Sequence, residues 1–596
     1  MSSGARNGQM TWLRRLVARA QGQFLTAFVV PGEEVARALG LDFAAAGLDV
    51  VPSPRHAAVL VLVGEIPPGL ARPTTVVYAQ MPRPRAILAV GANAPAHLPT
   101  PDIAVAPTQA ALVTGVQALR RQFATGAWAE DTVPFEVEAD ADIDTGEMHR
   151  DTHSGMQMDH GTLNKDPKPS DEQEQHGQHA NAAPHNTNGN DHASHHATAS
   201  DKPSENMNHG DSHPVAPGNI PGDVEPDRAH AMEHGNHGTH DMAMGGMDMG
   251  MSGGFMSMIA MTKDVPRSPD GLPMEWFDTP FGPLFAGLPG GLALTFTLDG
   301  DTVAQARMNT EIMTRHLGAT WMGPVALFPD RLARLDPLAP VAYRLLAWRA
   351  IESAAGIRVD DETARARIAA LEHARALSHL NWLAGFAALL GADGIAREAA
   401  RLHTALTHAR EETAMQCATA GVSAFARHLE RVPLLRQRLK GVGAIPTADA
   451  GNTYGPIARA SGYITDTRTD DPHARSLGFA PIAIAGSGGD ALARLHVRLR
   501  ETVQSLTMWE AARMYVMSDP LIPSALSGMG TGTVETPRGA ATLHVHIEDG
   551  AVRHVHLDVP STAHAKLVQS ITLQYEVADA LLGVASLDLS PWEMGQ

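Results

Sequence analysis

Strand-like and helix-like patterns alternate along the first 135 residues of the chain. Residues 57–64 and 86–91 are continuous apolar runs that end at a glycine, which is typical of strands buried on both faces. Residues 33–39 and 109–123 place apolar side chains three and four positions apart, as a helix requires. Strands that alternate with helices predict a parallel sheet covered on both faces, so we expect an N-terminal α/β domain.

Longer helical patterns dominate the last segment, residues 255–596. The segment opens with a strand-like run at residues 292–298. Apolar periodicity then predicts helices at residues 335–355, 361–390, 395–420 and 491–516, and strands at residues 543–547 and 552–559. We expect a mainly helical domain with β elements, and an α+β fold for the chain as a whole.

The middle segment, residues 136–254, has a very different composition. It contains no Phe, Trp or Tyr, but it holds about half of the 30 histidines and over a third of the 26 methionines. So little apolar bulk cannot offset the entropy lost when a backbone becomes ordered. We therefore predict a disordered His/Met-rich linker between two domains, residues 1–135 and 255–596.

Composition excludes several classes of protein. The net charge of −19 disfavours nucleic acid as a partner, because phosphate attracts basic surfaces. The single cysteine, Cys417, excludes an internal disulfide framework and a Cys-ligated zinc or iron–sulfur site within the chain. No apolar run reaches the ~18 residues that a membrane span needs. Residues 11–20 favour an amphipathic first helix over a signal peptide, so a cytoplasmic protein is expected.

The linker contains candidate metal ligands, which include His234, His237, His240, Met242 and Met244. Imidazole and thioether groups together suit copper, and weak copper or nickel binding is one interpretation. A low-complexity segment without a metal-binding role is the other. A disordered chain loses entropy when it binds an ion, so we expect modest affinity.

A second histidine pattern flanks a hairpin signal at residues 548–550: His544, His546, His554 and His556. Strand side chains alternate, so each pair shares one face of its own strand. A two-residue Asp549-Gly550 loop predicts the two pairs on opposite faces, and a three-residue loop through Ala551 predicts all four on one face. The two-residue turn is the favoured form, so we expect solvated strand histidines without a common metal site.

Three polar motifs follow one another along the last segment: residues 372–383 (EHARALSHLNWL), 455–468 (GPIARASGYITDTR) and 489–505 (GDALARLHVRLRETVQS). In this order they resemble the large subunit shared by respiratory complex I and group-4 nickel–iron hydrogenases. The resemblance implies a hydrogenase-large-subunit-like fold. It also implies a subunit of a membrane-associated NADH–quinone oxidoreductase complex, in which NAD and quinone are the substrates.

The first segment carries its own set of motifs: residues 53–57 (SPRHA), 78–84 (YAQMPRP) and 91–94 (GANA). They resemble the small, flavodoxin-like subunit that carries the terminal 4Fe–4S cluster in the same complexes. Asn93 stands where that family has a cysteine. The resemblance implies a natural fusion of small and large subunits.

The family's ligand positions hold other residues in this chain. Ser590 and Glu593 stand where hydrogenases carry the C-terminal cysteine pair, and neither is a soft ligand for nickel. Complex I holds the quinone headgroup with a histidine and a tyrosine, at positions occupied here by Phe285 and Pro337. Neither replacement can donate a hydrogen bond. The resemblance therefore implies a degenerate active site, and we expect no cofactor in this chain beyond weak copper or nickel in the linker.

Arg459, Asp466 and Arg468 are charged residues within the second motif. In a fold that resembles complex I, we expect them to serve an interface or structural role through charge pairs rather than catalysis.

Three functional hypotheses follow. The first is a structural or conformational subunit in ion-translocation coupling. Its partners would be antiporter-like membrane subunits and other arm subunits, and it would sit peripherally on the cytoplasmic face of the inner membrane. The second is a redox subunit that contributes to quinone reduction. The third is a copper- or nickel-responsive protein on a degenerate hydrogenase scaffold.

Overall fold

The computed structural model describes residues 22, 24–95, 97–125, 276–310, 312, 321–514 and 522–595. The described residues before and after the predicted linker belong to one compact unit. The linker itself lies outside the described residues, and so do its candidate ligands His234, His237, His240, Met242 and Met244. The predicted linker therefore stays a prediction.

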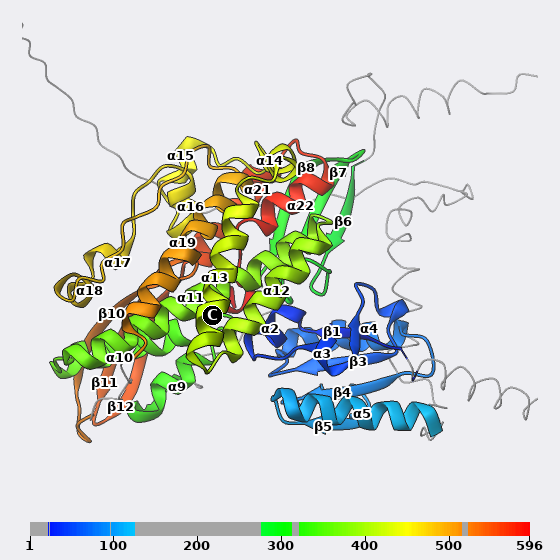
Figure 1. Cartoon of the computed structure of the whole chain (residues 1–596), viewed down its shortest axis with the longest axis horizontal. Coiled ribbons are helices and arrows are strands. Elements are labelled where there is room, and N and C mark those ends of the chain that lie inside the picture. Colours follow the sequence, from blue (N-terminus) through cyan, green and yellow to red (C-terminus); the bar gives the residue numbers. More distant parts are fainter. Residues whose placement is uncertain are drawn as a thin grey trace, which may run out of the picture. The chain divides into compact units, whose positions relative to one another are not determined.

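A five-stranded parallel sheet forms the first described part (Figure 1). Its strand order is β2-β1-β3-β4-β5. The sheet confirms the predicted parallel architecture, while the flavodoxin-like detail stays a prediction. Its strands are β1 (Leu25–Val30), β2 (Leu48–Val50), β3 (Val59–Val63), β4 (Ala86–Val90) and β5 (Ile103–Val105), and its helices are α2 (Glu33–Ala38), α3 (Phe43–Ala46), α4 (Ala71–Gln80) and α5 (Gln109–Thr125).

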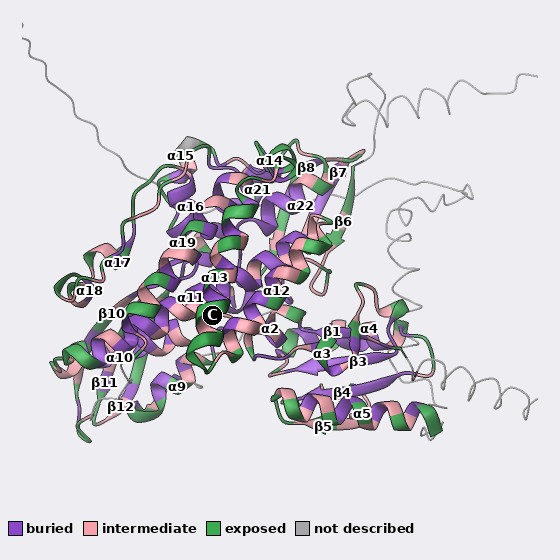
Figure 2. Cartoon of the chain, viewed as in Figure 1, coloured by how far each residue is buried: buried purple, intermediate pink, exposed green. Residues whose placement is uncertain are grey.

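Both faces of this sheet are covered, as the continuous apolar runs predict. Every residue of β3 and β4 is buried, and Figure 2 shows both strands in the colour of buried residues. One face packs against α2, α3 and α5, through side chains such as Leu112 and Phe123. The other face packs against α4, through Tyr78 and the nearby Met81. The middle strands therefore carry no polar alternation.

An antiparallel three-stranded sheet opens the last segment, as the strand-like run at residues 292–298 predicts. It consists of β6 (Phe277–Phe281), β7 (Ala293–Asp299) and β8 (Thr302–Asn309). Phe296 and Val303 on its inner face are fully buried in the largest hydrophobic cluster of the described chain.

The helical region follows. Its helices are α9 (Phe328–Ala333), α10 (Pro340–Ala355), α11 (Asp361–Leu389), α12 (Asp393–His408), α13 (Glu412–Leu429), α14 (Pro433–Leu439), α15 (Thr447–Ala450), α16 (Gly455–Ala460), α17 (Thr467–Asp470), α18 (Pro472–Ser476) and α19 (Ala491–Ala512). The longest, α11, is capped by Asp360, whose side chain accepts a hydrogen bond from the Thr363 amide. Helix α11 packs along α19 and α12.

The prediction of one helix over residues 395–420 is wrong. The chain leaves the helix at Ala409, which has an extended conformation, and restarts at α13. Helix α13 packs against α12, where Leu402 and Leu406 share a cluster with Ala418 and Val422. A single straight helix would leave these two apolar stripes unable to cover each other.

A second sheet has the order β10-β11-β12-β9 and consists of β9 (Gly323–Pro324), β10 (Gly528–Thr536), β11 (Gly539–Glu548) and β12 (Ala551–Asp558). The hairpin β11–β12 confirms the two predicted strands. Strand β10 was not predicted, because its alternating glycines carry no apolar pattern. They allow α10 to approach closely: a Cβ on Gly530 would lie 2.0 Å from the carbonyl oxygen of Ala350.

The predicted placement of the four hairpin histidines on opposite faces is wrong. The loop has the expected two residues, with Glu548 opposite Ala551. A register shift after His546 leaves Arg553 without an opposite residue. The extra residue shifts the register of β12 by one position. As a result, His544 lies opposite His556 and His546 lies opposite His554. All four therefore share one face.

Four short helices complete the described chain: α20 (Pro560–Ala565), α21 (Val568–Thr572), α22 (Val577–Ala585) and α23 (Pro591–Met594). Helix α22 packs into the core beside β8 and α11. Among the described residues, no helix has the length and apolarity needed to cross a membrane.

Candidate functional site

Seven buried ionisable side chains form a continuous network inside the helical region. We call it the arginine–carboxylate network, and its members are Glu372, Arg375, Arg459, Asp466, Arg468, Glu501 and Glu535. The network joins α11, α16, α17, α19 and β10. All three of the predicted residues in the second motif belong to it, and their charge pairs lie within the chain.

Helical spacing explains how two of the motifs meet. In α11, Glu372, Arg375 and His379 are separated by three and four residues, so they lie on one face. In α19, Arg498 and Glu501 follow the same spacing. Because α11 packs along α19, these two polar faces are brought together in the interior.

Arg459 is the centre of one half of the network. Its guanidinium is fully buried and donates from Nε to Glu501 Oε1 at 2.6 Å and from Nη1 to Glu535 Oε1 at 2.9 Å. Nη1 also donates to the carbonyl oxygen of Thr465 at 2.8 Å. The neighbouring carboxylates more than offset burial and raise the pKa of Arg459. Its positive charge is therefore fixed.

Arg468 is the centre of the other half. It donates to Asp466 Oδ2 at 2.6 Å and to Glu372 Oε2 at 2.9 Å. The Ser505 hydroxyl donates to the same Glu372 oxygen at 2.6 Å. Burial alone would raise the pKa of Glu372, but Arg375, Arg468 and Ser505 hold it below its usual value. The carboxylate is thus ionised in the interior.

His379 connects this network to a second group of charges. Its Nδ1 accepts a hydrogen bond from Arg498 Nη1 at 3.4 Å, because a guanidinium can only donate. The ring proton therefore sits on Nε2, which lies 3.4 Å from Glu501 Oε2. Burial lowers the pKa of His379 to about 4, so the ring is neutral at pH 7.

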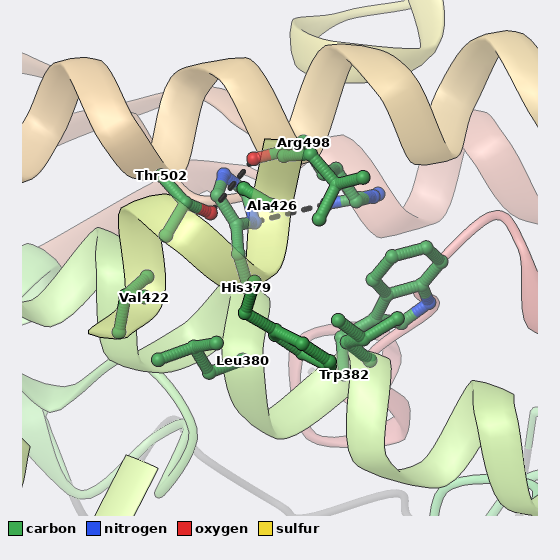
Figure 3. Close-up of a pocket in the computed structure, with 10 residues that line it drawn as sticks. His379, Leu380, Trp382, Val422, Ala426, Arg498 and Thr502 are labelled. Atoms are coloured by element: carbon green, nitrogen blue, oxygen red, sulfur yellow. Dashed lines mark hydrogen bonds between the residues drawn. The ribbon is translucent and has the colours of Figure 1, made fainter. Parts of the chain in front are cut away.

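A cavity of about 10 Å³ lies beside His379, between α11, α13 and α19, with room for roughly one water molecule. Val422 and Thr502 line it, together with Trp382, over whose ring the Arg498 guanidinium lies at 4.8 Å. Figure 3 shows His379 reaching from α11 toward Arg498 and Thr502.

The second group of charges surrounds Arg538, and we call it the Arg538 cluster: Asp336, Arg538, Asp588 and Glu593. Arg538 Nη1 donates to Asp336 Oδ2 at 2.9 Å and lies 3.5 Å from Glu593 Oε1. Arg498 reaches Asp588 Oδ2 at 3.1 Å, which links this cluster to His379. All four members are buried.

Two carboxyl groups of the Arg538 cluster have pKa values above their usual range. Burial raises the pKa of Asp588 and of Glu593, despite the attraction of Arg538. Burial and the nearby charges of Glu593 and Asp336 also raise the pKa of Tyr343 well above its usual value. Protons are therefore held here more tightly than in the arginine–carboxylate network, where the pKa of Glu501 is well below its usual value because Arg459 and His379 outweigh burial.

The two predicted ligand positions lie at this cluster. Ser590 and Glu593 are both fully buried, and the Glu593 carboxylate accepts a hydrogen bond from the Ser561 hydroxyl. The donor set does not fit a nickel–iron centre, because a guanidinium occupies the space where these carboxylates converge and no thiolate is present. Among the described residues, no three His, Cys, Asp or Glu side chains are arranged to hold a metal ion.

The two predicted quinone positions are less buried. Phe285 is 37% exposed at the β6–β7 turn, where its ring packs edge-on against Phe281. Pro337 is half-buried and directly follows Asp336 of the Arg538 cluster. Their neighbours Leu284 and Leu338 pack against the same hydrophobic cluster. The segments that carry Phe285 and Pro337 therefore pack against the same hydrophobic cluster. Neither side chain is a hydrogen-bond donor.

The N-terminal sheet also contacts this region. In helix α2, Glu34 accepts a hydrogen bond from the Gly290 amide at 2.7 Å. Arg37 donates to the Asn381 side chain of α11 at 2.8 Å. Trp592, between the two predicted ligand positions, belongs to the hydrophobic cluster of the N-terminal sheet. The Arg538 cluster thus adjoins the contact between the two described parts of the compact unit.

Sequence reasoning missed Arg538, Glu535 and Asp336 as site residues. Arg538 lies in the tight turn between β10 and β11, and Glu535 lies near the end of β10 just before it. Polar residues at a turn normally indicate a solvated loop. For Asp336, the one feature of the sequence that could have indicated a role was its position within the motif Arg-Leu-Asp-Pro.

Comparison with known proteins supports one family for the last segment of the chain. The family model of the respiratory-chain NADH dehydrogenase 49 kDa subunit matches residues 402–525. An NADH-quinone oxidoreductase subunit of Desulfotalea psychrophila is 26% identical over 373 residues, which cover 55% of this chain and 98% of that protein. Over the residues that they cover, these matches support the large-subunit family of complex I and group-4 hydrogenases. The resemblance of the first segment to the small subunit stays a prediction.

Further relatives are similar over parts of the chain. An NADH-quinone oxidoreductase subunit of Rhodopseudomonas palustris is 27% identical over 52% of this chain and 64% of its own length. An NAD(P)H-quinone oxidoreductase subunit of a Synechococcus strain is 29% identical over 39% of this chain and 67% of that protein. A chain of the membrane-bound sulfane sulfur reductase, an archaeal respiratory membrane complex, is 21% identical with a TM-score of 0.46, covering 54% of this chain and 99% of that one.

Proposed function

We propose that this chain is a peripheral subunit of a membrane-associated NADH–quinone oxidoreductase-like or hydrogenase-like complex, and that its own role is conformational rather than redox. The observation that carries the proposal is the ion-paired Arg538 beside Ser590 and Glu593, where the family's metal ligands would be expected. A cation held by carboxylates supplies no electron-transfer centre.

The line of buried charges supports a coupling role. It runs from Asp466 through Arg459 and Glu501 to His379, and then through Arg498 to the Arg538 cluster. His379 is neutral at its centre, between an anion and a cation. A proton added to it would weaken its contact with Arg498 and strengthen its contact with Glu501, because like charges repel. His379 would thus have one set of contacts when neutral and another when protonated. A charge-driven conformational switch requires two such states.

The proposal extends to partners and location. In it, antiporter-like membrane subunits and other arm subunits hold the chain at the cytoplasmic face of the inner membrane. Attachment is through protein contacts, since a chain with a net charge of −19 is repelled by anionic lipid. The chain carries no nickel or iron–sulfur centre of its own. The alternative of a quinone-reducing subunit has less support, because Phe285 and Pro337 offer no donor to a quinone.

The test uses the full chain, tagged at its own locus, so that the native complex can be isolated from membranes. Membrane subunits should co-purify. In membrane vesicles, His379→Gln should lower the ion gradient formed per turnover while the oxidoreductase rate is kept. The matched control is His428→Gln, at an exposed position on α13.

Two results would contradict the proposal. If no membrane subunit co-purifies, the chain is not a complex subunit. If the gradient and the oxidoreductase rate fall together in His379→Gln with the complex intact, the residue belongs to the redox path.

A further inference from the structure

The outer face of the β10–β12 sheet carries two rows of potential metal ligands. The first row is Thr531, His544 and His556, and the second is Met529, His546 and His554. The intervening residues Leu543, Val545 and Ile547 are buried, so the opposite side of β11 faces the core. The rows therefore face away from the protein, on neighbouring hydrogen-bonded strands.

The first row is close to the geometry of a two-imidazole chelate. The rings of His544 and His556 lie with centroids 6.1 Å apart and an interplanar angle of 23°. When two imidazoles bind the same metal ion, each through a nitrogen about 2.0 Å from it, their ring centroids lie roughly 5–6 Å apart. Both side chains are exposed, so small χ rotations bring both rings onto one ion.

The surroundings of this pair suit a cation. The Thr531 hydroxyl lies 2.9 Å from His544 Nδ1, and when it accepts from Nδ1–H the lone pair is left on Nε2. Metal-binding histidines are oriented in this way. The Asp558 carboxylate lies 3.5 Å from His556 Nε2, so it places a negative charge beside this pair.

The second row differs in two respects. Met529 is 78% exposed and offers a thioether opposite His546, which adds a soft ligand. Glu548 lies 3.6 Å from His546 Nε2, but the guanidinium of Arg553 lies 3.9 Å from the same carboxylate group. The added positive charge makes the first row the stronger site for a cation.

We propose that His544 and His556 form a two-imidazole surface site for a divalent transition-metal cation, with copper(II) bound most tightly. Because only two imidazoles converge, water completes the coordination. Among first-row divalent ions, copper(II) has the highest affinity for such a nitrogen site, nickel(II) and zinc(II) are weaker, and magnesium prefers oxygen ligands. The site is independent of the buried charges and of the proposed coupling role.

The test must distinguish this face from the histidines of the linker, so it reads each histidine separately. The full chain is treated with diethyl pyrocarbonate at neutral pH, with and without copper(II), and each modified histidine is quantified by mass spectrometry. Copper should reduce the modification of His544 and His556 several-fold. His428, an exposed histidine of α13, is the internal control and should be unchanged.

The variants define the ligands. In His556→Gln, the protection of His544 by copper should be lost, while the fold is kept because position 556 is exposed. Met529→Leu should leave the protection of His544 and His556 unchanged. Magnesium should protect neither residue. The proposal is overturned if His544 and His556 are modified equally with and without copper, if His428 is protected to the same extent, or if His544 stays protected in His556→Gln.

Discussion

Arg459 is the residue on which the arginine–carboxylate network depends most. It is the direct partner of both Glu501 and Glu535, and all three side chains are excluded from water. Removing one member of such a group leaves the others as uncompensated buried charges, which costs more than the ion pair contributes.

The substitution Arg459→Met tests this dependence. It should reduce the free energy of unfolding by about 3–5 kcal/mol, because two carboxylates lose their counterion in the interior. Urea unfolding of the full chain measures it. The control is Arg401→Ala, which removes an exposed pair with Glu398 on α12 and should cost less than about 1 kcal/mol. Equal losses in the two variants would show that the buried pairs carry no special weight.

The buried histidines make a second prediction at this scale, on pH. Burial lowers the pKa of His379 to about 4, while the unfolded chain titrates near 6.5. The unfolded state therefore binds the proton first, and stability should fall as pH decreases from about 6.5 toward 4, by roughly 3 kcal/mol for this residue. Burial also lowers the pKa of His403 and of His564, each to about 3, with the same sign.

His379→Gln removes one titrating group from this set. The urea midpoint should then depend less steeply on pH between 6.5 and 4 than in the unaltered chain, with the remaining slope due to His403 and His564. His428→Gln should leave the slope unchanged. A slope that is the same in all three proteins would mean that folding does not lower the pKa of His379.

At the scale of elements, the close approach of β10 to α10 depends on alternating glycines. A Cβ on Gly530 would lie 2.0 Å from the carbonyl oxygen of Ala350, so backbone would have to move. Gly385, inside α11, has nothing within 4 Å of the same added atom. The two positions therefore offer a matched pair of substitutions.

Gly530→Ala should destabilise the protein strongly, because sheet and helix must separate. Gly385→Ala should instead stabilise it by about 0.5–1 kcal/mol, because alanine loses less backbone entropy in a helix. Thermal unfolding of the full chain compares the two. If Gly530→Ala has the melting temperature of the unaltered chain, the packing of β10 on α10 is not as described.

Sequence patterns predict some elements better than others, for physical reasons. Strands β3 and β4 and helix α11 are predictable because long apolar or periodic runs leave one choice of structure. Strand β10 is not, because glycines that alternate with a methionine and threonines give no apolar alternation and resemble a loop. The faces of the hairpin histidines were wrong because a bulge at Arg553 leaves no mark in the sequence. Arg459, Asp466 and Arg468 were predicted to form charge pairs from their motif, whereas Arg538 sits in a turn that resembles a solvated surface.

At the scale of the whole molecule, the helical region encloses many buried charged side chains. Long helices that bring polar faces together need those charges to be paired, and here each of the four buried carboxylates of the network has a guanidinium within hydrogen-bond distance. In the Arg538 cluster, buried carboxylates are likewise paired with a guanidinium, beside the expected ligand positions. The family membership and the proposed non-redox role are therefore compatible.

Metal analysis of the purified full chain tests this account most directly. The protein should be prepared without oxygen and washed with a chelator, which removes ions from surface histidines and from the linker. Nickel, iron and acid-labile sulfide are then measured against protein concentration. We predict that none of the three is present in stoichiometric amount, because Arg538 occupies the expected position and no thiolates are available. Nickel with iron, or a stoichiometric 4Fe–4S cluster, surviving the chelator would contradict the account.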